Sequence, residues 1–416
     1  MSTVVNAQVA VIGAGVVGLS CAHALMRRGY DCVLLDARGP GAETSFGNAG
    51  SISVGNVLPQ STPGILRKGL RMLVDPLSPL KLDWARWPHY ARWLYDFVRS
   101  GREDAVMPII DALHALNAAT RDCWIDLAAD IGADELLAHT GYLHVYSEDA
   151  SFANGAWERG LMQARDVRFD VLDAAELRAL EPGIGEGFKH AVFQRDALAM
   201  RDPGGFCVAL ADALQARGLR SLQARVAAIE PGSGGYRLRS DAGDVRADKV
   251  VIAGGVWSNA LLAPFGLRIP VIPARGYHLM YPAPATPVVG RPTLWAERYM
   301  VVSPMRGGIR MTSIKELTAL DTVPRFGLIH RLDAEARKLF PALAATHASE
   351  WAGLRPCTPD SLPVIDRVGD EDVWLATGHG HLGLTQAPIT GRLIAESVAG
   401  LPTTLPLEPY RIARFG

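Results

Sequence analysis

The sequence predicts an α/β fold in which a domain with a parallel sheet is joined to a second domain with an antiparallel sheet. Three observations predict it. A buried strand at residues 8–12 runs into a glycine-rich turn and a helix. Apolar residues alternate through much of residues 269–314, which is typical of antiparallel strands. The chain closes with a further strand, glycine-rich loop and helix between residues 373 and 398.

The first turn has the sequence Gly13-Ala14-Gly15-Val16-Val17-Gly18, and a helix is predicted up to residue 28. In this spacing the first glycine allows a tight turn, the second lets a pyrophosphate approach the backbone, and the third lets helix and sheet lie close. The helix N-terminus offers N–H groups and a positive dipole end to phosphates. A second strand, residues 31–35, ends at Asp36, where an acidic side chain meets a ribose hydroxyl. These features predict a dinucleotide site.

Composition limits the remaining classes of function. The 416 residues suffice for two or three domains, and the net charge of −1 argues against a nucleic-acid partner. The five cysteines are scattered without a CxxC motif or a His/Cys cluster, so we expect a reducing compartment, no disulfide and no metal site. Neither a secretory leader nor a membrane-spanning helix is predicted, because glycines interrupt the apolar run at residues 9–25. A cytoplasmic location is therefore expected.

The segment after Asp36 is expected to meet the nucleotide. Ala37 and Arg38 follow the acid, and Arg38 has two interpretations: contact with phosphate or adenine, or binding of a 2′-phosphate. We favour the first, because Asp36 would repel a 2′-phosphate. Small and polar residues then crowd positions 43–53, which predicts a segment folded across the cofactor, although an ordinary surface loop has a similar composition. The residues concerned are Thr44, Ser45, Gly47, Asn48, Ala49, Gly50, Ser51 and Ile52.

Residues 80–98 concentrate three tryptophans among basic residues. Packing inside the second domain is the favoured interpretation, and contact with a membrane surface is the alternative. Pro88 is expected to break or begin a helix there. Apolar residues at helical spacing over residues 104–131 predict one long core helix.

The middle of the chain supplies further elements of both domains. A strand at 141–146, a helix at 173–180 with Asp173 and Glu176 as a capping box, and a helix at 204–216 are predicted. Strands are expected at 226–230 and 236–240, with Val226 at the adenine edge. A buried strand at 249–253 opens into Ala253, Gly254 and Trp257, which we expect to form a second contact with the nucleotide.

The second domain and the chain end complete the pattern. Strands are predicted at 269–281, 299–304 and 309–314, followed by a helix at 328–340. The last glycine-rich loop leads into a helix, giving a second helix N-terminus for the cofactor. Its expected cofactor contacts are Gly378, His379, Gly380, His381, Leu382, Gly383, Leu384 and Thr385.

These motifs, with residues 43–50, Arg275-Gly276-Tyr277 and residues 353–360, resemble the D-amino-acid oxidase family of FAD-dependent oxidoreductases, and within it the bacterial D-amino-acid dehydrogenase small-subunit type. The resemblance implies a Rossmann-like FAD-binding domain of the GR2 type, formed by residues 1–80, 196–265 and 346–416. An inserted α+β substrate domain with an antiparallel sheet would comprise residues 81–195 and 266–345.

The sequence departs from the family pattern at three points. Asp36 stands where the family more often has Glu. Met305 follows Pro304, where the glycine-oxidase branch has an arginine. Cys357 lies only three residues before Asp360, nearer than the attachment cysteine of the sarcosine-oxidase branch, so FAD is expected to be non-covalent.

The resemblance implies oxidative deamination or dehydrogenation of a D-amino acid, of the D-proline or hydroxy-D-proline type, giving an imino or keto acid. Hydride would pass from Cα to flavin N5, and N–H groups at 380–384 would stabilise the reduced ring. An O2-using oxidase of the glycine or sarcosine type is the alternative; an NAD(P)-dependent reductase and a non-catalytic flavoprotein subunit are further classes. A dehydrogenase needs a quinone or protein electron acceptor, which fits a peripheral position on the inner face of the inner membrane.

A substrate carboxylate calls for a planar bidentate donor, which is arginine. Arg275 and Arg310 lie on strands of the expected substrate sheet, and Tyr277 shares the face of Arg275. Arg298 and Arg355 are further candidates, the latter within a predicted cofactor motif, whereas Arg306 is expected in solvent at a hairpin tip. We expect His379 or His381 to contact flavin or substrate, and Asp360 to fix a loop.

Overall fold

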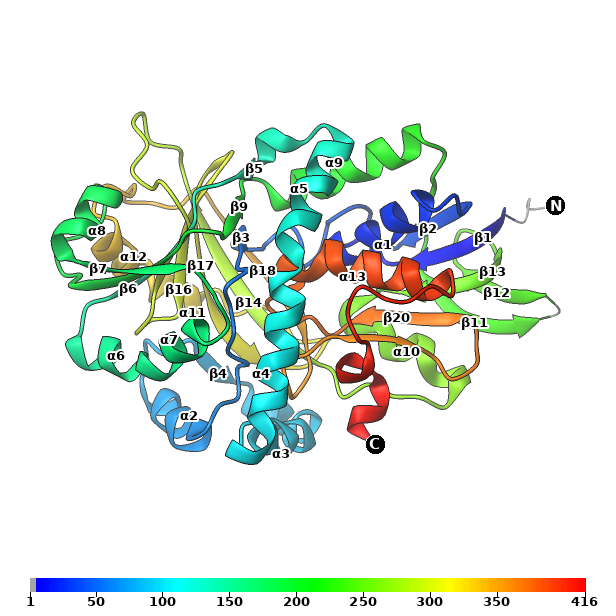
Figure 1. The fold of residues 1–416 in the computed structure, drawn as a ribbon, viewed down its shortest axis with the longest axis horizontal. Coiled ribbons are helices and arrows are strands. Elements are labelled where there is room, and N and C mark those ends of the chain that lie inside the picture. Colours follow the sequence, from blue (N-terminus) through cyan, green and yellow to red (C-terminus); the bar gives the residue numbers. More distant parts are fainter. Residues whose placement is uncertain (1–4, 233) are drawn as a thin grey trace.

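The computed structural model describes residues 5–232 and 234–416, which form two large sheets lying next to each other (Figure 1). The first is an eight-stranded sheet with the order β10-β2-β1-β13-β12-β11, to which β20 and β19 are added beside β13. Its strands are β1 (Val5–Ile12), β2 (Cys32–Asp36), β10 (Arg220–Gln223), β11 (Val226–Gly232), β12 (Gly235–Ser240), β13 (Val245–Ile252), β19 (Val364–Arg367) and β20 (Val373–Thr377). Neighbours β10, β2, β1, β13 and β20 are parallel. The predicted α/β fold is confirmed.

One face of this sheet is covered by helices from distant parts of the chain. They are α1 (Val16–Met26), α4 (Glu103–Ala118), α5 (Thr120–Ile131), α9 (Pro203–Ala216) and α13 (Gly383–Val398). Helices α1 and α13 approach closely, since a Cβ at Gly391 would lie 2.3 Å from the carbonyl oxygen of Ser20. The two chain ends therefore share one core.

The single helix predicted over residues 104–131 is wrong, because the structure interrupts it at Ala119. The second half is anchored on the start of α13: the Thr120 hydroxyl donates to the carbonyl of Thr385 at 2.6 Å, and Trp124 Nε1 donates to that of Leu384 at 3.0 Å. Both helices thus lie in the core of the nucleotide-binding side, although the expected domain boundary assigned residues 81–195 to the substrate domain.

The second sheet has nine strands in the order β18-β14-β17-β16-β15-β6-β8-β7, with β4 paired to β17. Its strands are β4 (Leu80–Leu82), β6 (Tyr142–Tyr146), β7 (Phe169–Asp173), β8 (His190–Gln194), β14 (Ile272–Tyr281), β15 (Thr293–Trp295), β16 (Met300–Met305), β17 (Gly308–Leu317) and β18 (Ser349–Cys357). Because β18 pairs with β14, residues 349–357 belong to this sheet, not to the FAD-binding segment 346–416 expected for them. A small sheet joins β3 (Ser51–Ile52), β5 (Leu137–Ala138) and β9 (Leu198–Met200).

Shorter helices surround the second sheet. They are α2 (Ile65–Val74), the 3₁₀ helix η1 (Trp84–His89), α3 (Ala91–Ser100), α6 (Asp149–Asn154), α7 (Ala156–Gln163), α8 (Ala174–Leu180), α11 (Gly327–His330) and α12 (Asp333–Leu339), with α10 (Ser258–Leu262) beside the first sheet. The capping box of Asp173 and Glu176 is confirmed. No helix in the described ranges combines the length and apolarity needed to cross a bilayer.

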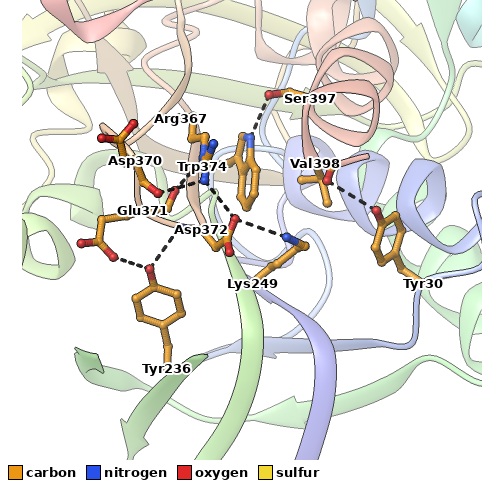
Figure 2. Close-up of polar contacts among 10 residues, drawn as sticks. All are labelled: Tyr30, Tyr236, Lys249, Arg367, Asp370, Glu371, Asp372, Trp374, Ser397 and Val398. Atoms are coloured by element: carbon orange, nitrogen blue, oxygen red, sulfur yellow. Dashed lines mark hydrogen bonds and ion pairs between the residues drawn. The ribbon is translucent and has the colours of Figure 1, made fainter. Parts of the chain in front are cut away.

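Polar contacts fasten the C-terminal hairpin β19–β20 to the first sheet (Figure 2). Trp374 is buried between the cations of Lys249 and Arg367, which lie 5.4 and 5.5 Å from its ring centroid. Its Nε1 donates to Ser397 Oγ at 2.9 Å, so the tryptophan also ties β20 to the end of α13. The Tyr236 hydroxyl accepts from the amide of Asp372 at 3.1 Å. Strand β20 therefore holds the glycine-rich loop at residues 378–382 in place relative to β13.

Candidate functional site

The first glycine turn has the geometry that a nucleotide requires. Gly13 has a φ of +110°, and a Cβ there would lie 2.5 Å from the carbonyl oxygen of Ala253. A Cβ at Gly18 would lie 1.9 Å from the carbonyl oxygen of Gly13. Gly15 is the N-cap of α1 and carries no side chain that would block the approach of a phosphate. These three positions form a cradle that side chains would fill.

Asp36 lies at the end of β2 and organises the turns around it. One carboxylate oxygen accepts from the Ala14 amide at 2.8 Å, and the other accepts from the amides of Arg38 and Gly39 at 2.7 and 2.9 Å. The Arg38 guanidinium forms an exposed ion pair with Glu43 at 2.7 Å. The other expected nucleotide contacts of this region lie at the ends of β1, β2 and β13 or at the starts of α1 and β11. They are Ala14, Val16, Val17, Ala37, Val226, Gly254 and Trp257.

The loop at residues 44–50 is clamped to the second sheet. Arg310 donates to the carbonyl oxygens of Phe46 and Asn48 at 2.8 and 2.6 Å, and burial lowers its pKa to about 10. The Thr44 hydroxyl donates to the carbonyl of Leu354 at 2.7 Å. A Cβ at Gly47 would lie 1.8 Å from the Trp351 ring, so only glycine fits there. The loop thus spans the two sheets, as expected for a segment folded across a cofactor.

Several small residues of this segment have defined partners. Ser45 Oγ accepts from the amide of Val16 at 3.0 Å, which joins the loop to the first turn of α1. The Gly50 amide donates to Asn48 Oδ1 at 2.8 Å. Ala49, Ser51 and Ile52 continue into β3.

The C-terminal loop separates its two histidines. His379 Nε2 lies 3.0 Å from Thr390 Oγ1 on α13, and burial lowers the pKa of His379 to about 3, so the ring is neutral. This contact ties one ring nitrogen of His379 to α13. His381 is exposed, with Nδ1 2.6 Å from Gln60 Nε2. Helix α13 begins at Gly383 without a side-chain cap from Leu382.

The structure does not bring Arg275 and Tyr277 to this site. Both lie on the face of β14 opposite to Gly276 and His278, and His278 contacts the carbonyl of Gly47. The Tyr277 hydroxyl donates to Glu316, and this hydrogen bond and burial raise the pKa of Tyr277 to about 12. Arg275 is buried 3.8 Å from the same carboxylate. Their role as carboxylate-binding residues is therefore not supported by their positions.

The other candidates are placed as follows. Arg298 is ion-paired with Glu335 at 3.2 Å, and Arg306 is exposed at its hairpin. Asp360 accepts from Arg414 at 2.7 Å and from the Leu362 amide at 3.1 Å, which fixes its loop. The sequence patterns did not single out Gln60, Trp351 or the hydroxyls of Ser303 and Thr312. Residues two apart on a strand share a face, so the position of Arg310 could have indicated that Thr312 faces the same site.

Outside this site, His330, His347 and Glu350 place one ligand atom each within 4.8 Å of one another at the surface, a group that the sequence did not predict. His330 Nε2 contacts the Glu350 carboxylate at 2.6 Å. We assign this group to an ion pair.

Residues 8–397 match the family model described as FAD dependent oxidoreductase (DAO), and the chain belongs to this family. The glycine cradle, the uncapped start of α13 and the clamped loop fit FAD on the structure's own evidence. The protein is an FAD-dependent oxidoreductase of the D-amino-acid oxidase/dehydrogenase type, which confirms the family, cofactor and enzyme class that the sequence predicted.

Curated relatives match over nearly the whole chain. This chain is 32% identical to a D-amino-acid oxidase of Bradyrhizobium diazoefficiens, and the match covers 98% of both chains. It is 34% identical to D-amino acid dehydrogenase 2 of Pseudomonas aeruginosa, covering 96% of both. Among solved structures, glycine oxidase from Geobacillus kaustophilus superposes with a TM-score of 0.79 at 21% identity, covering 98% and 99% of the two chains, which shows a shared fold.

Proposed function

We propose that this protein dehydrogenates a D-amino acid at Cα and passes the electrons to a quinone or protein acceptor. The observation that carries the proposal is whole-length similarity to proteins named D-amino acid dehydrogenase, at 33% and 34% identity in two of them. FAD, when bound, would supply the acceptor of the hydride. The chain itself has to hold the cofactor, orient the substrate and exclude water.

The proposed FAD contacts are those expected from the sequence. Arg310 is a positioning residue, because it holds the loop at residues 44–50 through two carbonyls. The substrate compartment would lie between that loop and the face of the second sheet that carries Arg310 and Thr312.

Two buried hydroxyls support a hydroxylated substrate. Ser303 Oγ and Thr312 Oγ1 have no hydrogen-bond partner within the described residues. They lie on neighbouring strands, on the face of Arg310, because Ser303 pairs with Arg310 across β16 and β17. A buried hydroxyl without a partner is costly, so a substrate hydroxyl would satisfy it. This favours hydroxy-D-proline over D-proline.

The test is anaerobic bleaching of the flavin absorbance by a panel of D-amino acids, their L-enantiomers, glycine and sarcosine. We expect bleaching by D-amino acids, with hydroxy-D-proline acting at lower concentration than D-proline. Turnover is expected with a dye or quinone and not with O2. Failure of every D-amino acid to bleach the flavin would contradict the proposal.

The second candidate is an O2-using amine oxidase, which the relative named D-amino-acid oxidase at 32% identity favours. Hydrogen peroxide formed at the rate of substrate oxidation, without any added acceptor, would establish it in place of the dehydrogenase.

We further propose that the segment 63–100 contacts a membrane surface, where a dehydrogenase would meet its acceptor. Helix α2 has no buried residue, and Leu66, Leu70 and Val74 form an exposed stripe along it. In η1, Trp84 and Trp87 are 67% and 50% exposed, which fits contact with a membrane surface. Trp93 of α3 is buried, which fits packing inside the domain.

A further inference from the structure

A cavity of about 360 Å³ lies between α1, α5 and α13, three of the helices that cover one face of the first sheet (Figure 1). Its volume is within the range of sites that bind small molecules. The lining comes from α1 and the residues that follow it, between Ser20 and Arg28, and from the sides of α5 and α13. Arg27 lies 12 residues beyond Gly15, a rise of about 18 Å along a helix, so this end of the cavity is remote from the turn that faces the nucleotide.

Three arginines line this cavity, and each has N–H donors left for a further acceptor. Within the described residues the Arg27 guanidinium forms no ion pair. Arg28 lies 3.7 Å from the Glu396 carboxylate. Arg392 lies 3.7 Å from that of Asp126, and both separations exceed a hydrogen bond.

The dipole of α1 explains only part of this group. Arg27 and Arg28 follow the C-terminal end of α1, where positive charge is favoured. Arg392 lies in the middle of α13, where no such stabilisation acts. A cation from a second helix therefore faces the same cavity for another reason.

The cavity is also lined by a buried hydroxyl that lacks a partner. Ser20 is 2% exposed, and its Oγ has no hydrogen-bond partner within the described residues. The close approach of α13 at Gly391 restricts this part of α1, because a Cβ at Gly391 would collide with the Ser20 carbonyl oxygen. A buried hydroxyl left unpaired is costly, and an acceptor in the cavity would supply the missing bond.

The other polar groups of the lining do not cancel its positive charge. Asp126 is the carboxylate among them. His23 Nε2 lies 2.7 Å from Asp130, which also accepts from Arg217. Burial lowers the pKa of His23, so its ring is neutral at pH 7. Three guanidiniums against one carboxylate leave an excess of two positive charges on the lining.

We propose that this cavity binds the phosphate group of a small phosphorylated molecule, at a site separate from that of FAD and independent of the proposed reaction. A phosphate monoester carries close to two negative charges and three acceptor oxygens, which match the excess charge of the lining. The guanidinium fork suits phosphate oxygens, and the Ser20 hydroxyl supplies a further donor. A single carboxylate would leave one positive charge unmatched. The bound phosphate would link the end of α1 to α13, the two helices whose N-termini are assigned to FAD.

The test is isothermal titration calorimetry of the FAD-loaded protein at pH 7 and constant ionic strength. The probes are inorganic phosphate and phenyl phosphate, with acetate as the carboxylate comparison. Both phosphates should bind at least about tenfold more tightly than acetate, as the second matched charge requires. Arg392→Met should raise the dissociation constant for phosphate at least about tenfold, the effect of losing a hydrogen bond between charged groups.

Ser20→Ala distinguishes a ligand-binding hydroxyl from a structural one. It should raise the same dissociation constant about tenfold. The unfolding temperature of the phosphate-free variant should stay equal to that of the parent or rise, because the substitution removes a buried hydroxyl that has no partner. A hydroxyl that served only the fold would lower the unfolding temperature and leave phosphate binding unchanged.

The control is Arg306→Met, which removes an exposed arginine of the second sheet and should bind phosphate like the parent. If Arg392→Met loses FAD, Arg27→Met gives the same comparison at an exposed side chain. A parent that takes up neither phosphate, or that binds acetate as tightly, overturns the proposal. Parent-like phosphate binding in an FAD-loaded Arg392→Met or Arg27→Met variant overturns it as well.

Discussion

At the scale of single residues, the partners of each buried cation decide what it can do. Arg310 donates to two backbone carbonyls of the cofactor loop, and Arg275 is held by Glu316 and by the carbonyl of Thr322. Lys315 and Arg355 have no acidic partner among the described residues. A cation whose charge is already matched holds structure, whereas one left unmatched in a desolvated site is available to a ligand.

Arg310 gives the residue-scale prediction. In Arg310→Met the carbonyls of Phe46 and Asn48 lose a charged donor, and each such bond contributes roughly 1.5–3 kcal/mol. The loop at residues 44–50 should loosen, and the dissociation constant for FAD should rise at least about tenfold. The flavin-free protein is titrated with FAD, and the quenching of FAD fluorescence gives this dissociation constant.

The matched control is Arg306→Met, on the exposed hairpin between β16 and β17. It should bind FAD like the parent. Unchanged FAD affinity in Arg310→Met would show that the clamp does not support the cofactor.

At the scale of elements, Trp374 ties the C-terminal hairpin to Lys249 of β13 and to the end of α13 (Figure 2). Trp374→Ala removes a buried ring, its bond to Ser397 and its contacts with Lys249 and Arg367. Truncation of a buried tryptophan costs about 3–5 kcal/mol, so we expect an earlier urea midpoint and loss of FAD in the same transition. Trp157→Ala, at an exposed ring on α7, should shift the midpoint little. FAD retained beyond the first transition of Trp374→Ala would contradict this coupling.

The elements also show how far sequence patterns reach. The glycine turn, Asp36 and the last loop were predictable because their spacing follows from the local demands of a phosphate and a helix N-terminus. The faces of β14 and β17 were not predictable. A strand pattern gives alternation, but a bulge at Ile314 reverses it, and nothing local marks that residue as left-handed. The local pattern likewise does not mark the interruption at Ala119, and the residues after it hydrogen-bond to α13, more than 200 residues away in the sequence.

At the scale of the whole molecule, the exposed apolar segment lies next to the second sheet. Helix α2 packs against β4, and β4 pairs with β17 so that Leu80 lies opposite Lys315. Helix η1 follows β4 directly, and α2 lies at the lower edge of the molecule in Figure 1. Residues 63–100 contain seven basic and three acidic side chains, a balance that favours an anionic surface. A membrane-held acceptor would therefore approach the molecule next to β17, the strand that carries Arg310.

This arrangement predicts binding to anionic vesicles through the stripe on α2 and the ring of Trp84. A Leu66→Ala, Leu70→Ala, Trp84→Ala variant should lose most co-sedimentation with phosphatidylglycerol vesicles, because each apolar side chain contributes about 1 kcal/mol or more when it leaves water. Raised salt should weaken binding of the parent, since the basic residues contribute a screened attraction. Turnover with a soluble dye should be unchanged, because these side chains point to solvent.

The control variant is Trp157→Ala with Leu401→Ala, which changes two exposed apolar residues outside this segment. It should sediment like the parent. If the triple variant also sediments like the parent, the segment does not meet the membrane and the acceptor must dock elsewhere.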